Sequence, residues 1–420
     1  MSRVAFRDLL GEPVRNGVYK PKEFHGSGVK LVNMKELFAF DFLSNQPDAR
    51  IELTPAEFAK SQLRDGDLLF ARRSFVLEGA GKCSLVVNPP ESLTFESSMI
   101  RARPNPDKAD SRFLYYYFRS PDGRARMASI AARTAVSGIT GSNLAALEID
   151  VPGVDAQREI AEILSLFDEL IENNRRRGQV LEDMARAIYQ EWFVKFRYPG
   201  HEAVPIVDSA LGPIPEGWQV QTASHAIQIN PTIKVVRSAE HPFIAMGDVS
   251  ETSMVCYPSE TRTGGTGARF VNGDTLLARI SPSLQNGKTG FVQSLEDGVV
   301  GHGSTEFIVM RGRTVGRAFT YCLARQDEFR SNAIASMVGA SGRQRVRNEC
   351  FDTYYLAVPP ATLNESFEAV AAPMFAEVDL LRRQAISLRA ARDLLLPKLV
   401  TGQIGVSGLK LDRVLEGAVA

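Results

Sequence analysis

The chain contains few of the residues that usually carry chemistry. Its 420 residues include only four cysteines, five histidines and two tryptophans. The cysteines form no CxxC pair and have no histidine at metal-ligand spacing, which disfavours both disulfides and zinc sites. We therefore expect buried thiols at Cys83, Cys256, Cys322 and Cys350.

The sequence also lacks a net charge and any apolar run long enough to span a membrane. Its 49 basic and 49 acidic residues cancel, which argues against a protein that holds nucleic acid by overall charge alone. The first residues lack the apolar core and the small-residue cleavage site of a signal peptide. We expect a cytoplasmic protein with no membrane partner.

Recognisable catalytic motifs are missing as well. No lysine has an acid two residues before it, the pattern of common metal-dependent nucleases. At 88–91 (NPPE), glutamate stands where an adenine methyltransferase needs an aromatic ring to stack the flipped base. The Gly-Lys-Thr at 287–289 resembles the end of a phosphate-binding loop, but Pro282 stands where that loop needs glycine. We predict no catalytic residue, no metal site and no cofactor bound by this chain itself.

Charge is distributed unevenly along the chain. Residues 101–133 carry eight basic against three acidic residues, and residues 311–347 carry eight arginines against two acids. Residues 155–172 carry six acids against one arginine. Arginine suits paired hydrogen bonds to phosphate or guanine. A coding bias toward arginine explains the enrichment equally well.

An internal repeat with an offset of 207 residues organises the chain. The stretch LRDGDLLFARR at 63–73 returns as FVNGDTLLARI at 270–280, and each copy is followed by a Gly-Lys pair. A Val-Pro step at 151–152 returns at 358–359. Each Gly-Asp pair followed by leucines predicts a turn, a buried strand and a hairpin. We predict two α+β halves produced by tandem duplication.

Each half is followed by a long helical pattern, at 154–197 and 361–402. Apolar residues recur on average every 3.5 positions, as in a coiled-coil seam, and about forty helical residues span roughly 60 Å. We predict an antiparallel pair of helices that holds the halves apart, rather than two ordinary core helices. Asn174 and Arg177 interrupt the seam. They either set its register or mark a bend.

These blocks together resemble the specificity subunit of type I restriction–modification systems. The resemblance rests on GDLLFARR and GDTLLARI, the two Val-Pro steps, AQREIAEILSLFDELIENNRR, AIYQEWFVKFRYPG, LGPIPEGW and LLLPKLVTGQI, in that family's order. The segment 361–370 lacks the Gln-Arg of its counterpart, which leaves the residue-level symmetry of the first helical turns open.

The resemblance implies an organisation and a set of partners. It implies target recognition domains at 1–153 and 198–360, helical spacers at 154–197 and 361–402, and a tail at 403–420, with an internal pseudo-twofold repeat. The domains would each read half of a split double-stranded DNA sequence, and the helices would bind two methyltransferase subunits. Restriction subunits would add cleavage. S-adenosylmethionine, ATP and Mg²⁺ would belong to these partners.

Candidate DNA-binding residues are polar or basic side chains in the repeated hairpins and in two dissimilar loops, 136–143 and 338–347. They are Arg72, Arg73, Lys82, Ser137, Thr140, Ser142 and Asn143 in the first half, and Arg279, Gln285, Asn286, Lys288, Ser341, Arg343, Gln344 and Arg345 in the second. The loops are the better specificity candidates, because residues that read different bases should differ between the halves. A scaffold without DNA readout and a self-contained enzyme are the alternatives.

Overall fold

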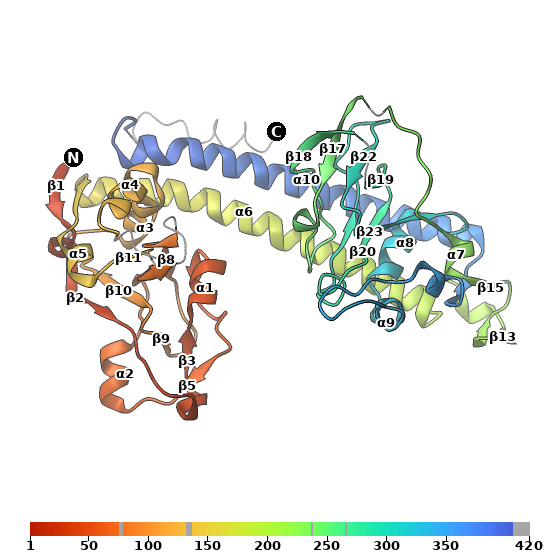
Figure 1. Ribbon diagram of the computed structural model, residues 1–420, viewed down its shortest axis with the longest axis horizontal. Helices are drawn as coiled ribbons and strands as arrows, with labels where there is room; N and C mark the ends of the chain where they lie inside the picture. The colour runs from red at the N-terminus through yellow and green to blue at the C-terminus, as the bar shows by residue number, and fades with distance from the viewer. Residues whose placement is uncertain (75–78, 132–136, 237, 265–266, 406–420) are drawn as a thin grey trace. The chain divides into compact units, whose positions relative to one another are not determined.

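The computed structural model describes residues 1–74, 79–131, 137–236, 238–264 and 267–405. The chain forms two compact units (Figure 1). The first comprises residues 1–171 and the segment that starts at Ile386, and the second comprises residues 172–385. Each unit contains its own sheets and one portion of both long helices. Most of the predicted tail, 403–420, lies outside the described residues.

The first unit is built on a five-stranded sheet and a three-stranded sheet. The larger sheet has the order β2 (Leu10–Asn16), β10 (Met99–Pro104), β6 (Leu68–Ala71), β8 (Cys83–Val86) and β4 (Phe42–Leu43). The smaller has the order β5 (Arg50–Ile51), β3 (His25–Val32) and β9 (Leu93–Phe95). Two short ladders join β1 (Ser2–Ala5) to β12 (Glu148–Val151) and β7 (Arg73–Ser74) to β11 (Ser137–Gly138).

The helices of the first unit pack its core against the long helix that follows. Helix α3 (Ser111–Arg119) is capped by Asp110 and buries six consecutive residues, Phe113 to Phe118. Its Tyr116 hydroxyl donates to Asp168 of the long helix α6 (Val154–Tyr189; 2.6 Å), so α3 lies between the sheet and α6 (Figure 1). The other helices are α1 (Met34–Ala39), α2 (Pro55–Ser61), α4 (Pro121–Ser129) and α5 (Gly141–Ala146).

The second unit repeats this plan with different strands. One four-stranded sheet has the order β16 (Ile227–Ile229), β23 (Phe307–Gly312), β20 (Thr275–Ala278) and β21 (Thr289–Phe291). The other has the order β18 (Glu260–Thr263), β17 (Glu240–Ile244), β22 (Gly301–Gly303) and β19 (Ala268–Phe270). Two ladders join β13 (Ile206–Ser209) to β14 (Gly212–Pro215) and β15 (Gln219–Thr222) to β24 (Tyr355–Val358). The helices are α7 (Ala223–Ala226), α8 (Arg317–Ala324), α9 (Asp327–Ala335) and the short η6 (Met246–Asp248).

The two long helices are α6 (Val154–Tyr189) and α10 (Ala361–Val400). Within the first unit, Leu164 and Phe167 of α6 share a core with Leu388 and Leu399 of α10. Within the second unit, Asn174 donates to Gln384 (3.3 Å) and Arg177 pairs with Glu377 (3.1 Å), so the helices run in opposite directions there. Asn174 is buried in this polar contact, and α6 continues through it.

The cysteines follow the prediction at three of four positions. Cys83, Cys256 and Cys322 are buried, and burial raises the pKa of the Cys256 thiol to about 12. Cys350 is only half-buried, because it lies on a 3-10 turn (Asn348–Phe351) that faces solvent on one side, so the prediction of four buried thiols was wrong there. Among the described residues, no helix is long and apolar enough to cross a membrane.

Two buried histidines stack in the second unit. The rings of His241 and His302 lie 4.3 Å apart and nearly parallel. Both His241 nitrogens face backbone carbonyls, of Val236 (3.1 Å) and Val300 (3.2 Å). Burial, assisted by His241 and the positive charge of Arg269, lowers the pKa of His302.

This pair predicts acid sensitivity of the second unit. The folded-state pKa of His302 lies below the unfolded value of about 6.5. The stabilisation that neutral His302 gives the folded state is therefore complete above about pH 6.5 and is lost as the pH falls from there through the folded-state pKa. Between pH 7.5 and 5.5 we expect the urea midpoint of tryptophan fluorescence to fall, and to fall less in His302→Asn. The exposed His225 provides the control, His225→Asn. An equal fall in wild type and His302→Asn would contradict the assignment.

Candidate nucleic-acid interface

The repeated Gly-Asp pair forms the same buried turn in both units. Gly66 and Gly273 adopt positive φ angles of 80° and 91°, where glycine is favoured. The Asp67 carboxylate accepts from the Arg64 amide (2.7 Å) and from Arg103 through both oxygens (2.7 and 2.8 Å). Asp274 does the same with the Val271 amide (2.8 Å) and Arg311 (2.7 Å twice). These aspartates stabilise the turn and are unavailable to a ligand.

The predicted hairpins are confirmed. Strand β6 pairs antiparallel with β8, and β20 pairs antiparallel with β21. The Gly-Lys-Thr of the second copy leads directly into β21, so it belongs to a hairpin and not to a phosphate-binding loop.

The repeated arginine directly follows the first strand of each hairpin, which is β6 in the first unit and β20 in the second. The Arg72 amide donates to Ser98 O, and the Arg72 carbonyl accepts from the Ile139 amide (2.8 and 2.9 Å). In the second unit, the Arg279 amide donates to Glu306 O (2.9 Å), and the Arg279 carbonyl accepts from the Val346 amide (2.8 Å). The next residues also correspond, because Arg73 pairs with Gly138 and Ile280 with Arg345. The two dissimilar segments, 136–143 and 338–347, therefore lie at the same place in each unit, beside the residue that follows the repeated arginine.

In the first unit, the strand ends around Arg72 form one surface, which we call the first strand-end surface. Strand order places the end of β2, the start of β10 and the end of β6 side by side. Arg73 is exposed and Arg72 is half-exposed, and neither side chain has a hydrogen bond or ion pair with residues that the structure describes. The surface comprises Asn16, Arg72, Arg73, Ser97, Ser98, Thr140 and Ser142.

The segment predicted as a loop at 136–143 is ordered over its described part. Ser137 belongs to β11, although its side chain lies outside the described part of the chain. Thr140 caps helix α5, because its hydroxyl oxygen accepts from the Asn143 amide (3.1 Å) and contacts Ser142 Oγ (3.0 Å). The loop prediction was wrong here because threonine at this position is a strong helix cap. Thr140, Ser142 and Asn143 remain exposed.

In the second unit, the corresponding surface carries a tight turn, and we call it the second strand-end surface. Val338 and Arg345 exchange backbone hydrogen bonds (2.9 and 3.0 Å), so the predicted loop at 338–347 is a closed hairpin. Ser341 and Arg343 project from it and are exposed, whereas Gln344 is half-exposed. Among the described residues, these three side chains have no hydrogen-bond or ion-pair partner. The surface comprises Asn230, Arg279, Thr305, Glu306, Ser341, Arg343, Gln344 and Arg345.

The other predicted residues of this unit already have protein partners. Arg345 forms an ion pair with Glu306 (2.7 Å), which lowers the pKa of that carboxyl. Arg279 donates to Val346 O (3.0 Å). Gln285 donates to Ser281 Oγ (2.8 Å) and Asn286 to Glu251 (3.0 Å).

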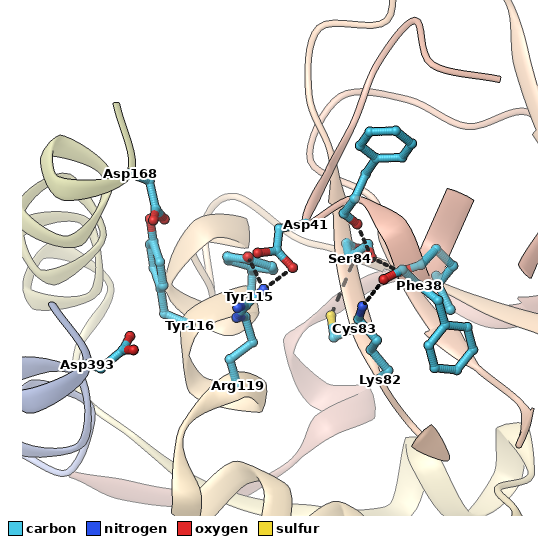
Figure 2. A network of polar contacts seen from close by, with 12 residues as sticks. Phe38, Asp41, Lys82, Cys83, Ser84, Tyr115, Tyr116, Arg119, Asp168 and Asp393 are labelled. Carbon is cyan, nitrogen blue, oxygen red and sulfur yellow. Dashed lines mark hydrogen bonds and ion pairs between the residues drawn. The ribbon is translucent and has the colours of Figure 1, made fainter. Parts of the chain in front are cut away.

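The repeated lysines brace the hairpins. Lys82 Nζ donates to Phe38 O at the end of α1 (2.5 Å) and lies 5.2 Å from the centre of the Phe38 ring (Figure 2). Burial lowers the pKa of Lys82. Lys288 Nζ donates in the same way to Met246 O of η6 (2.8 Å). The bonds tie each hairpin to a preceding helical turn, which favours a structural role over phosphate binding.

Sequence reasoning missed the polar networks that attach the aromatic helices. In the first unit, Arg119 donates to Tyr115 Oη (2.7 Å) and forms an ion pair with Asp41 (Figure 2). In the second, the Tyr321 hydroxyl donates to Glu182 of α6 (2.6 Å). The aromatic run at 113–118 was a signal for a buried helix, but its partners are distant in sequence. Within the described residues, no group of three or more histidine, cysteine or acidic side chains is arranged to hold a metal ion.

The two α+β units share one hairpin plan and carry different exposed side chains at their strand-end surfaces. A family model described as the type I restriction modification DNA specificity domain matches residues 45–183. The chain is 24% identical over 408 residues to the type I restriction enzyme MjaIX specificity subunit of Methanocaldococcus jannaschii, covering 93% of this chain and 90% of that protein. It is 30% identical over 161 residues to the Escherichia coli K12 EcoKI specificity subunit, covering 38% of this chain and 34% of that protein.

A solved structure supports the same fold. The crystal structure of a type I restriction–modification S subunit from M. genitalium matches 95% of this chain and 96% of its own, with a TM-score of 0.55 at 14% identity. That likeness concerns the fold alone. Residues 45–183 thus match the DNA specificity domain of type I restriction–modification systems, and over nearly its whole length the chain is similar to a type I restriction enzyme specificity subunit.

Proposed function

We propose that this chain is the non-catalytic subunit that reads a bipartite double-stranded DNA target for a type I restriction–modification complex. The observation that carries the proposal is the strand-end surface, built twice with the same backbone hydrogen bonds and different exposed side chains. Arg72 and Arg73 of the first unit, and Arg343 and Gln344 of the second, have solvent-accessible side chains with no hydrogen-bond partner among the described residues, so they can contact DNA. A common backbone with divergent side chains suits two domains that read different bases.

The long helices suit the attachment of two methyltransferase subunits and the separation of the two half-sites. In the second unit, Val180 and Met184 of α6 and Leu380 of α10 expose apolar side chains to solvent. Val180 and Met184 stand four residues apart, so they share one face of α6 that a partner helix would bury. The antiparallel pair would act as a ruler with pseudo-twofold symmetry. S-adenosylmethionine, ATP and Mg²⁺ would act in the methyltransferase and restriction subunits.

Methylation mapping tests the proposal. The chain is co-expressed with its neighbouring methyltransferase in a host that does not methylate adenine, and the genome is sequenced for N6-methyladenine. We expect a split motif that disappears when this chain is omitted. A stable complex, seen by size-exclusion chromatography, without new methylation would instead support a scaffold that does not read DNA.

Arg343→Ala tests the second strand-end surface. Because one bidentate arginine contact is worth about 1–3 kcal/mol of base discrimination, roughly 5- to 150-fold, we expect that much relaxation in one half of the motif. The matched variant Arg73→Ala should relax the other half. Binding of the assembled complex to duplexes mutated in either half measures both. Equal loss over both halves would show that Arg343 contributes only general attraction.

A further inference from the structure

Tyr19 has the most exposed large apolar side chain among the described residues. Its side chain is 84% accessible to solvent. An aromatic ring held in water loses the favourable burial that such a side chain normally contributes. A ring in this position is therefore available to a partner.

The backbone around Tyr19 is tied down on both sides. The Val18 amide donates to Phe95 O (2.8 Å), and the Val18 carbonyl accepts from Ser97 (2.9 Å). On the other side, the Lys20 carbonyl is held by the His25 ring (3.2 Å) and Pro21 fixes the next φ angle. The backbone of Tyr19 is thus held by hydrogen bonds to Val18 and Lys20, its two neighbours, and we call this segment, 18–20, the frame of Tyr19.

That frame belongs to the first strand-end surface. Ser97 is bonded to Val18, and the next residue, Ser98, accepts from the Arg72 amide (2.8 Å). Exposed basic residues flank the ring in sequence, namely Arg15 and Lys22. An exposed aromatic ring with basic residues close to it in the chain suits contact with sugars and base edges while the cations hold phosphates.

The second unit has no aromatic residue at the corresponding position. Strand β16 takes the place of β2, and its exit begins with Asn230, whose amide donates to Val309 O (2.7 Å). Pro231, Thr232, Ile233 and Lys234 follow, and none of them is aromatic. A residue that differs between equivalent positions can contribute to reading different half-sites.

We infer that Tyr19 lays its ring against the sugars or bases of the half-site read by the first unit. The inference rests on the proposed function and adds one contact to it. Partial burial of this ring against sugars or a thymine methyl group is worth about 1.5 kcal/mol, so roughly tenfold in affinity. The ring supplies this contact, and the hydroxyl is secondary.

Crosslinking and binding test the inference in the complex with the methyltransferase subunits. The probe is a duplex with the mapped motif, in which thymines of the first half-site are replaced one at a time by 5-iodouracil. We expect a light-induced crosslink on the peptide that contains Tyr19. Tyr19→Ala should weaken binding about tenfold, with Tyr19→Phe close to wild type, because the buried ring area makes the contact. Tyr355, 54% exposed on β24 of the second unit, provides the control Tyr355→Ala.

The outcomes separate this inference from the proposed function. If the wild-type complex does not distinguish motif from non-motif duplexes, the proposed function fails. If it does distinguish them, while Tyr19→Ala binds like wild type and no crosslink reaches Tyr19, only the inference is overturned. Loss in Tyr19→Phe equal to that in Tyr19→Ala would also overturn it, because the hydroxyl and not the ring would then make the contact.

Discussion

Replacing Glu182 with alanine is expected to destabilise the second unit by about 3 kcal/mol or more. The carboxylate is buried, accepts from the Tyr321 hydroxyl (2.6 Å) and the Met254 amide (2.7 Å), and lies 3.8 Å from Arg325. Alanine would leave two buried donors without an acceptor and a buried guanidinium without its counter-charge. Glu182→Gln keeps one carbonyl acceptor but removes the charge and replaces the second oxygen by a donor, so its cost should lie between wild type and Glu182→Ala.

Tryptophan fluorescence measures this effect selectively. The chain's two tryptophans, Trp192 and Trp218, both pack in the core of the second unit. A urea titration followed by tryptophan emission therefore reports that unit. Glu172→Ala on the same helix is the control, because Glu172 pairs with the exposed Arg175 and Arg176 and such pairs contribute about 0–1 kcal/mol. Similar midpoints for Glu182→Ala and Glu172→Ala would mean that the buried contacts are not needed for stability.

The local parts of the fold could be predicted from the sequence. The Gly-Asp turn and the buried strand after it depend on a positive φ at glycine and on four apolar or small residues in a row. The starts of α6 and α10 follow from the Val-Pro steps, whereas α6 ends at Tyr189 and gives way to a π-helical turn before the predicted end at 197. These features depend on neighbours in the chain, which a sequence displays directly.

The partners of the candidate site residues could not be predicted in this way. Lys82 and Lys288 were assigned to DNA because they recur beside a repeated arginine, yet each donates to a carbonyl about forty residues earlier. Arg345 was assigned on its charge, and its partner Glu306 is brought near by strand pairing. Tyr19 gave no signal at all, because the exposure of one aromatic residue depends on the packing of every strand around it.

Removing the repeated aspartate is expected to destabilise each unit separately and unequally. Asp67→Ala should cost the first unit about 3 kcal/mol, since Arg103 is 14% exposed and would lose its bidentate partner while keeping Glu12 (2.7 Å). Asp274→Ala should cost the second unit less, about 1–3 kcal/mol, because Arg311 is 32% exposed and can turn toward water. Each variant also removes the acceptor of one backbone amide in the turn. This amide belongs to Arg64 in the first unit and to Val271 in the second.

Each of these two variants is the control for the other, because the tryptophans lie in the second unit and follow its unfolding alone. Asp274→Ala should shift the tryptophan transition, whereas Asp67→Ala should leave it in place and speed hydrogen exchange in β6 and β10. Asp67→Asn keeps the acceptor for the Arg64 amide but removes the charge, so it should lie between wild type and Asp67→Ala. If Asp67→Ala moved the tryptophan transition as far as Asp274→Ala does, the units would unfold as one body. The duplication would then have produced a single cooperative structure instead of two modules that can diverge in their exposed side chains while keeping the same buried turn.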